Sequence, residues 1–567
     1  MDRNILLAFL LSTLVLVGYY QFFPPQETPK KAAGTATTLS APATGAEAAG
    51  ETASVTPSAT LEAAGPADSA APAPLAVAKD VVVEAPHYQA VIDTNGGTLK
   101  AFYLKDYLYA GPDPKPSNNW IYHLIGYKEK TAYDPQRWVN MVGHNQPQWQ
   151  VLPLKEQNPA QFYGTSSERL EVQGEATELV LAANLQNGLR ITKTLTFHPE
   201  DYLITLQVAL ENPTDNPIRV KPSFNMGAGN EIVEPDQFNH PQRGAAIVDG
   251  SFKTYSDSDF ETPVELQKLR WAGVMDTYFI SALKPQGEEN FSLTLEGVEA
   301  LAHGNKILVP TMLYQEPEFE LRSGQRYKKT FDLYLGPKVQ REMEKYDQRL
   351  PASLDLGWFD FLAYPMLAVL RWLFSLAHNW GVAIILLTLV VRALLFPLAF
   401  KGMLSMRRMA KLNPRMKYLR DKYKNDKDRL NREVMELYKK NKVNPIGGCL
   451  PLLMQVPVFI ALYSALMPAI ELRHQGFALW LTDLSATDYT LILPFLMGAS
   501  MFLQQHITPQ PAMDPVQAKV MKFMPLVLVF FFLDMPSGLV LYWVVSNILT
   551  LFQQLFFNKI KEAEIEH

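Results

Sequence analysis

A single arginine inside a long apolar segment is the feature that most constrains this chain. Residues 380–401 read WGVAIILLTLVVRALLFPLAFK, with Arg392 in the interior of the run. About twenty such residues are enough for a helix to cross the ~30 Å hydrocarbon core of a bilayer. At a rise of ~1.5 Å per residue, Arg392 then lies about 18 Å from one end of the run and about 13 Å from the other.

A guanidinium at that depth costs about 2.5–3.5 kcal/mol on insertion scales. One interpretation is that Arg392 extends along its helix to the nearer membrane surface. The other is that it lines a polar, water-filled cavity inside the protein. Its depth favours the cavity, and so does the hydroxyl of Thr388, one helical turn earlier on the same face.

The length and the cysteine usage constrain the remaining chain. Its 567 residues predict more than one domain. The single cysteine, Cys449, excludes an intrachain disulfide, so any domain outside the membrane must be held by its core alone. A net charge of −5 gives no general indication of nucleic-acid binding.

The first 340 residues divide into three parts. Residues 1–23 contain an apolar run that ends in aromatic rather than small residues, which favours a transmembrane signal anchor over a cleaved signal peptide. Residues 24–79, rich in Ala, Pro and Thr, predict a flexible linker. Residues 80–340 alternate apolar and polar positions between turn signals, which predicts a large periplasmic β-sandwich. Its aromatic and acidic residues are compatible with a sugar site, although core packing explains them equally well.

The rest of the chain predicts a helical membrane protein. Residues 341–378 suit an amphipathic helix at the membrane surface. Residues 379–558 contain five apolar runs, which with the signal anchor make six transmembrane helices, followed by a short tail at 559–567. We find no phosphate-binding loop, no catalytic pair and no metal-ligand spacing, so we expect no enzyme activity and no cofactor.

A strongly basic stretch sets the expected orientation. Residues 401–445 predict a helical hairpin, and an excess of lysine and arginine of this size fixes a loop in the cytoplasm. Both termini are then cytoplasmic and the β-sandwich lies on the outer side of a bacterial inner membrane. The basic residues assigned to this hairpin as a candidate contact surface are Arg407, Arg408, Lys411, Arg415 and Lys417.

Several motifs occur in one order along the second half of the chain. They are NKVNPIGGCLPLLMQVPVFIALY at 441–463, FALW at 477–480, DLS at 483–485, FMP at 523–525 and PSGLVLY at 536–542. Together they resemble the signature of the YidC membrane protein insertases, of the YidC/Oxa/Alb group. The N-terminal helix, linker and β-sandwich are similar to the Gram-negative form, so the resemblance covers essentially the whole chain.

The resemblance implies a hydrophilic groove between five core helices, open to the cytoplasm and to lipid. Groove residues would be Arg392, Thr388, Tyr542 and Trp543, although relatives often have a second tyrosine where this chain has Trp543. A slide for client helices would lie on the third and fifth spans and nearby residues. Its members would be Val456, Pro457, Phe459, Met497, Phe523 and Phe531.

The implied function is that of an insertase and chaperone for nascent membrane proteins, working alone or with the Sec translocon. The lipid bilayer is a further partner. Ribosome binding should be weak because the tail is short and net acidic, and no nucleic acid other than ribosomal RNA is expected. Two alternatives remain open from the residues alone. One is a secondary transporter that binds an anion at Arg392, and the other is a sugar enzyme or binder in the β-sandwich.

Overall fold

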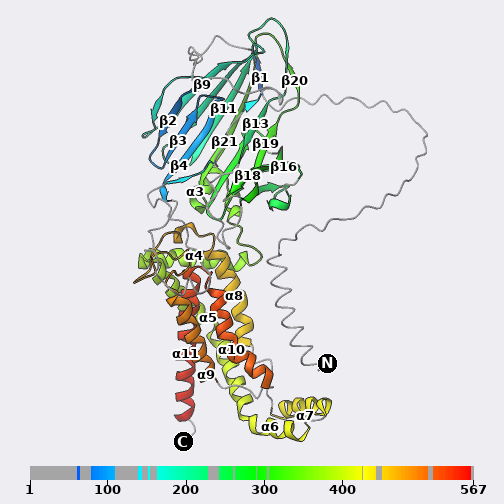
Figure 1. Cartoon of the computed structure of the whole chain (residues 1–567), viewed down its shortest axis with the longest axis vertical. Helices are drawn as coiled ribbons and strands as arrows, with labels where there is room; N and C mark the ends of the chain where they lie inside the picture. The colour runs from blue at the N-terminus through cyan, green and yellow to red at the C-terminus, as the bar shows by residue number, and fades with distance from the viewer. Residues whose placement is uncertain are drawn as a thin grey trace, which may run out of the picture. The chain divides into compact units, whose positions relative to one another are not determined.

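The structure is a computed structural model, and it describes most of the chain after residue 77. The described residues are 60–63, 78–108, 138–142, 151–152, 163–227, 242–259, 262–288, 290–302, 305–423, 426–441, 450–508 and 515–563. The predicted signal anchor, most of the linker and the C-terminal end of the tail lie outside these residues. Figure 1 shows the strands gathered in one region and helices α4 to α11 in another.

The β-rich domain is built almost wholly from antiparallel strands. Within the described residues, the strands form a 14-stranded, a five-stranded and a two-stranded sheet. The larger sheet follows the order β6-β13-β19-β18-β16-β17-β21-β11-β10-β9-β7, with β1, β14 and β15 off this path, and the five-stranded sheet follows β5-β4-β3-β2-β8.

The strand bounds are β1 (Thr60–Ala63), β2 (Asp80–Glu84), β3 (Tyr88–Asp93), β4 (Thr98–Leu108), β5 (Trp138–Asn140), β6 (Val151–Leu152), β7 (Gly164–Thr165), β8 (Arg169–Glu171), β9 (Thr177–Asn184), β10 (Arg190–Phe197), β11 (Leu203–Glu211), β12 (Ile218–Val220), β13 (Ser223–Met226), β14 (Arg243–Val248), β15 (Ser251–Tyr255), β16 (Val264–Met275), β17 (Phe279–Pro285), β18 (Phe291–Ala302), β19 (Asn305–Gln315), β20 (Phe319–Leu321) and β21 (Gln325–Pro337).

The larger sheet curves until strands that are not neighbours face each other across a core. Phe224 on β13 stacks on Phe331 on β21 with ring centroids 4.6 Å apart, although four strands separate β13 from β21 in the sheet. The five-stranded sheet covers another part of the same core, where Tyr88 on β3 lies 6.4 Å from Phe197 on β10. Packing of aromatic rings thus holds the facing strands together, as disulfides do in many extracytoplasmic domains.

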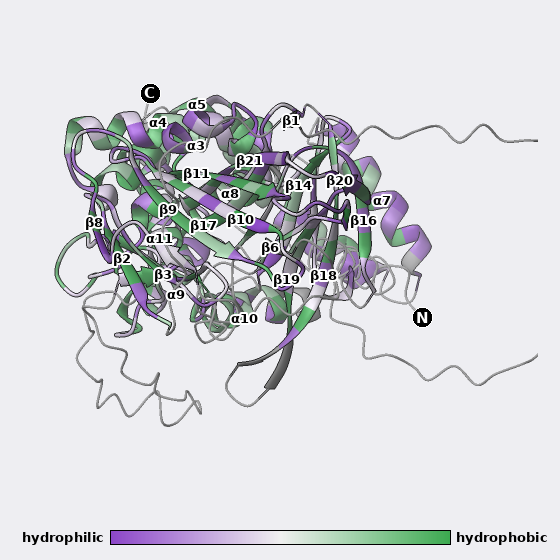
Figure 2. Ribbon diagram, turned by 90° about the horizontal axis from the view of Figure 1, so that it is seen from above, coloured by the Kyte–Doolittle hydropathy of each residue, from purple (hydrophilic) through white to green (hydrophobic). Residues whose placement is uncertain are grey.

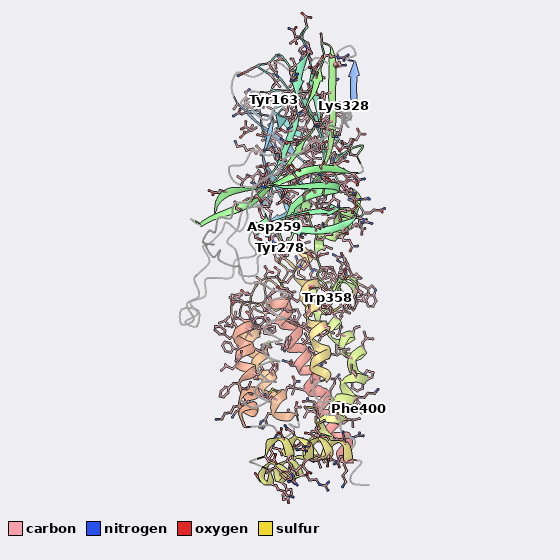
Figure 3. All side chains as sticks on the ribbon, turned by 90° about the vertical axis from the view of Figure 1, so that its right-hand side faces the viewer. Tyr163, Asp259, Tyr278, Lys328, Trp358 and Phe400 are labelled. Atoms are coloured by element: carbon pink, nitrogen blue, oxygen red, sulfur yellow. The ribbon has the colours of Figure 1, made fainter. Side chains whose placement is uncertain are left out.

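One strand falls in the segment that the sequence predicts as linker. β1 pairs antiparallel with β21, and its Thr60 is opposite Lys328, which Figure 3 labels. The prediction of an unstructured linker over all of 24–79 is therefore wrong at these four residues. Composition alone does not reveal this pairing, because the hydrogen bonds come from the backbone and the partner strand lies far along the chain.

Buried ions reinforce the domain. Lys329 on β21 is almost fully buried and forms ion pairs with Glu288 and, at 3.1 Å, with Glu316. Tyr314 donates a hydrogen bond of 2.7 Å to Glu316, and burial together with this carboxylate raises the pKa of the Tyr314 phenol. Lys193 is also fully buried and donates to the backbone carbonyls of Gly96 and Gly97 at 2.8 Å, while burial lowers its pKa to about 7.

The helical part contains nine α-helices within the described residues. They are α3 (Gln340–Tyr346), α4 (Asp360–Ala377), α5 (Trp380–Lys411), α6 (Asn413–Lys422), α7 (Lys427–Lys440), α8 (Leu450–Leu466), α9 (Ile492–Ile507), α10 (Pro515–Phe532) and α11 (Ser537–Ala563), with short 3-10 turns at 257–259, 350–354 and 470–472. Trp358, just before α4, and Phe400 on α5 lie toward opposite ends of the helical region (Figure 3).

By length and composition, three of the described helices can span a bilayer. They are α4, α5 and residues 537–557 of α11. The other predicted spans in this part of the chain coincide with the helices α8, α9 and α10. In α8, residues 455–466 form a shorter apolar helix. The sequence predicts α4 as a helix at the membrane surface, whereas its length and hydropathy also suit a span.

The basic stretch 401–445 is divided among three helices, because its first part, up to Lys411, continues α5 and only α6 and α7 follow as separate helices. The prediction that the hairpin begins at residue 401 is therefore wrong. α5 ends at Lys411, and α6 begins at Asn413 with Pro414 in its first turn, where a residue without an N–H is tolerated. Asp426 caps α7 by accepting from the Arg429 N–H at 3.0 Å. Met409 and Leu412 form a small apolar cluster with Met406, Leu437 and Tyr438, and α7 shows distinct hydrophilic and hydrophobic faces in Figure 2.

A network of charges fixes the chain where it leaves the β-rich domain. Asp347, just after α3, accepts from Arg270 Nε at 3.0 Å and from Lys284 Nζ at 3.1 Å. Burial alone would raise the pKa of Asp347, but the hydrogen bonds from Arg270, the Arg349 N–H and Lys284 hold it below its usual value. The segment that leads from the sheet to α4 is therefore tied to β16 and β17 through a buried carboxylate.

Lys329→Met should lower the free energy of unfolding of the β-rich domain by about 3–5 kcal/mol, because two buried carboxylates would lose their cation. Lys328→Met is the matched control, since Lys328 is exposed on the same strand and its loss should change stability by less than about 0.5 kcal/mol. Urea unfolding of the full chain, followed by tryptophan fluorescence, measures both. Equal effects of the two substitutions would contradict the ion-pair account.

Candidate functional site

Arg392 is held by a hydroxyl on another helix. Its Nε donates to Ser546 Oγ on α11 at 2.9 Å, and one of its terminal nitrogens donates to the same oxygen. Gln455 on α8 lies 3.4 Å from that oxygen through its amide nitrogen. Three helices, α5, α8 and α11, therefore meet at one polar point.

The guanidinium has no anionic partner within the part of the chain that the structure describes. No Asp or Glu carboxylate there lies within ion-pair distance of Arg392, and its side chain is only partly buried. A guanidinium carries five N–H donors in a fixed plane, and one hydroxyl oxygen engages two of its nitrogens here. The site thus provides a positive charge that is oriented but not neutralised, which suits attraction of a polar or acidic segment.

Thr388 lies one turn before Arg392 and has a different environment. It is fully buried, and its hydroxyl donates to the backbone carbonyl of Ile384 at 2.7 Å. Threonine commonly makes this bond to the fourth preceding residue within helices. In this structure its hydroxyl is thus used by its own helix, and a role in the groove stays a prediction.

Tyr542 and Trp543 lie next to each other on α11 but have different surroundings. Tyr542 is buried one turn before Ser546. Trp543 packs in an aromatic cluster, with its ring centroid 5.0 Å from Phe459 on α8 and 5.1 Å from Phe532 on α10. The indole thereby joins three helices by ring contacts, so position 543 contributes packing where a tyrosine would add a hydroxyl.

The residues predicted to form the client slide differ in exposure. Val456, Phe523 and Phe531 are exposed by 49%, 59% and 41%, so these side chains are available to a client or to lipid. Pro457 and Phe459 are partly buried. Met497 on α9 is fully buried, and its contact with a client stays a prediction.

The predicted basic surface divides between two helices. Arg407, Arg408 and Lys411 lie in the last turns of α5, and Arg415 and Lys417 lie on α6. Four of them are exposed, whereas Arg407 lies over the ring of Phe557 on α11 at 5.4 Å. Phe557 also contacts Phe400 at 5.2 Å, so Arg407 helps to hold α5 against α11.

Sequence reasoning did not identify the other polar residues between the helices. Besides Ser546 and Gln455, Asn547 donates to Ser500 Oγ at 2.9 Å and Gln554 donates to Thr508 Oγ1 at 2.8 Å, both between α11 and α9. A signal was available, because residues 546, 550 and 554 are polar and recur every four residues within the last apolar run. Within the described residues, no group of three or more His, Cys, Asp or Glu side chains is placed to hold a metal ion.

Two family matches divide the chain between its domains. Residues 372–564 match the family described as 60Kd inner membrane protein, and residues 80–369 match the YidC periplasmic domain. The fold and the matches together define a helical inner-membrane protein that carries a periplasmic β-rich domain.

Full-length relatives specify the family. The membrane protein insertase YidC of Syntrophus aciditrophicus is 36% identical over 99% of this chain and 100% of its own, and that of Geobacter metallireducens is 35% identical over 99% and 98%. The chain belongs to the YidC family of membrane protein insertases. A crystal structure of an active YidC insertase is 19% identical and covers 86% of this chain and 95% of its own at a TM-score of 0.36, a likeness too distant to add to this assignment.

Trp543→Ala should destabilise the helical region by about 3–5 kcal/mol, because it removes a large ring from the contact between α8, α10 and α11. Trp543→Phe and Trp543→Tyr should keep most of this packing. Phe552→Ala is the control, since Phe552 is an aromatic residue on the same helix that is 65% exposed. Thermal unfolding in detergent compares the four variants, and loss of stability in Trp543→Phe as large as in Trp543→Ala would contradict the packing role.

Proposed function

We propose that this chain inserts nascent membrane proteins by drawing a hydrophilic client segment toward Arg392 and releasing the client's apolar helix into lipid. The observation that carries the proposal is the guanidinium of Arg392, which is held in position by Ser546 without a carboxylate partner among the described residues. A charge kept in this state attracts acidic or polar segments more strongly than it would in water, because the surrounding helices lower the local dielectric.

The helices around Arg392 suggest how a client would move. We propose a groove that is open to the cytoplasm and to lipid and lies between α5, α8 and α11. A hydrophilic segment placed there has less hydrocarbon left to cross. The exposed side chains of Val456 on α8 and of Phe523 and Phe531 on α10 would then contact the apolar helix of the client as it leaves. No covalent step and no nucleotide is needed.

The proposed topology has six transmembrane helices with both termini in the cytoplasm. The excess of lysine and arginine over residues 401–445 supports it, because basic loops stay on the cytoplasmic side. The segment between α8 and α9 carries Glu471, Asp483 and Asp488, which suits the opposite side. α6 and α7 would then project as a cytoplasmic hairpin that receives clients, the Sec translocon or the ribosome.

A secondary transporter that binds an anion at Arg392 is the alternative function. It would use the same charge but would require two related halves around the site, and the hydropathy pattern shows no inverted repeat. The transporter hypothesis also gives no function to the basic residues of the predicted hairpin. A sugar enzyme or binder in the β-rich domain would need free polar groups, whereas the carboxylates of Glu288 and Glu316 are engaged by Lys329.

Arg392→Ala should impair insertion of clients that have acidic outer tails, and should impair clients with neutral tails less. Arg392→Lys should keep much of the activity, because attraction depends on the charge more than on the planar guanidinium. Reconstituted insertion of a matched pair of clients, one acidic-tailed and one neutral, measures the difference at equal protein levels. Equal loss for both clients would refute attraction by charge and indicate a structural role for Arg392.

Replacing residues 404–440 with an equally basic, unstructured loop should reduce insertion while leaving the topology intact. The reason is that α6 and α7 present their charges on a folded surface, whereas a topology signal needs only the charges. The measurement is insertion of newly made small membrane proteins in cells depleted of the native copy. Unchanged insertion would show that the lysines and arginines serve only to orient the chain.

A further inference from the structure

A large apolar side chain stands exposed at the tip of a tight turn between α8 and α9. Leu479 is 88% exposed, more than any other large hydrophobic residue in the described chain. Its φ angle of +57° lies in the left-handed region, which leucine rarely adopts. The exposure of so large an apolar side chain is unfavourable in water, and the left-handed backbone conformation is strained in any medium, so other interactions must hold this position.

The turn is held firmly, so the exposure of Leu479 does not come from a loose loop. The Phe477 N–H donates to the Leu481 carbonyl at 2.9 Å, and the Leu481 N–H donates to the Ala478 carbonyl at 3.1 Å. The Trp480 indole N–H donates to Asp488 at 3.3 Å. These contacts fix both sides of the turn and leave the Leu479 side chain at its tip.

Contacts with α5 set the level of this turn relative to the membrane. Asn379 caps α5 by accepting from the Val382 N–H at 3.0 Å, and its amide nitrogen donates to the Phe477 carbonyl at 3.1 Å. The ring of Phe477 packs so closely on Gly381 that a Cβ there would come within 2.1 Å of it. The turn is therefore attached to the first residues of a membrane-spanning helix.

The helix that precedes α5 presents an exposed apolar face. α4 ends two residues before α5 begins, and the side chains of Phe361, Trp372 and Leu376 on its outer face are exposed by 71%, 60% and 60%. Its other face packs against the bundle through residues such as Ala363, Leu367 and Leu370. A helix that is apolar on both faces requires an apolar medium on the side that the protein does not cover.

We propose that the turn 477–481 inserts Leu479 among the acyl chains of the leaflet into which the exposed face of α4 is immersed. The occupant of this surface is lipid, because α4 exposes Phe361, Trp372 and Leu376 and the turn is bonded to the first residues of α5, which spans the membrane. The turn and α4 would hold the end of α5 from two sides. They would thereby fix the depth of Arg392, which lies three turns further along the same helix.

A fluorescence depth measurement on the full chain tests this proposal. Cys449→Ser supplies a background without cysteine, because it removes the only one. Leu479→Cys is then labelled with an environment-sensitive fluorophore and reconstituted in nanodiscs of phosphatidylcholine and phosphatidylglycerol. Nitroxides attached to the lipid acyl chains quench a label in the membrane, and iodide quenches a label in water.

Two control positions give the quenching expected of a label in the hydrocarbon and of a label in water. Leu394→Cys, 75% exposed on α5, reports the hydrocarbon, and Ala176→Cys, exposed between β8 and β9, reports water. We expect the label at 479 to be quenched by acyl-chain nitroxide nearly as strongly as at 394, and to be protected from iodide relative to 176. If Leu479→Cys unfolds, Ala478→Cys, which is exposed on the same turn, can be labelled instead to measure the depth of the turn in the membrane.

Strong quenching by iodide at 479 would overturn the proposal, because the turn would then lie in water. Protection from both quenchers would also overturn it, since a protein surface and not lipid would cover the leucine. Client insertion does not enter this measurement, so its result is independent of the function proposed for Arg392.

Discussion

The helical region depends on keeping one guanidinium inside an apolar bundle without neutralising it. A carboxylate beside Arg392 would stabilise the charge but would also compete with any client that the charge has to attract. Ser546 avoids this competition, because a neutral hydroxyl orients the guanidinium and leaves its net charge in place. The contact at Ser546 also joins α5, α8 and α11, so the same interaction that positions the charge holds together the helices around it.

Polar contacts elsewhere on α11 extend this arrangement to α9. Asn547 and Gln554 bind Ser500 and Thr508, and the aromatic cluster at Trp543 adds α8 and α10. Between helices in lipid the hydrophobic effect gives little drive for association, so hydrogen bonds and close packing must supply it. α11 is therefore the element that most of the helical region packs on, whereas α10 retains an outward face with exposed Phe523 and Phe531.

Patterns that are local in sequence were sufficient to predict much of this protein. Alternation over residues 80–340 predicted the strand-rich domain, and the five apolar runs over residues 379–558 predicted helices where α5, α8, α9, α10 and α11 lie. Composition does not predict which strands pair when they are far apart in the chain. β1 is an example, because it pairs with β21 more than 260 residues away. The resemblance placed Arg392 and Thr388 together in a groove, yet Thr388 bonds its own helix, a choice that depends on side-chain rotamers and not on spacing. Ser546 belongs to a polar row with Thr550 and Gln554 that the sequence does show, but its partner Arg392 is 154 residues away and is not indicated by that row.

The two parts of the chain share a junction built from arginines rather than from a flexible connection. Arg371 on α4 pairs with Glu471 and also donates to Gln340 on α3 at 3.0 Å. Arg473 donates to the Leu108 carbonyl at 2.7 Å and lies over the rings of Tyr278 and Phe279. Both arginines engage the 470–473 segment, which leads into the turn that holds the start of α5. Residues of the β-rich domain thus contact the same segment that leads into the turn at the start of α5.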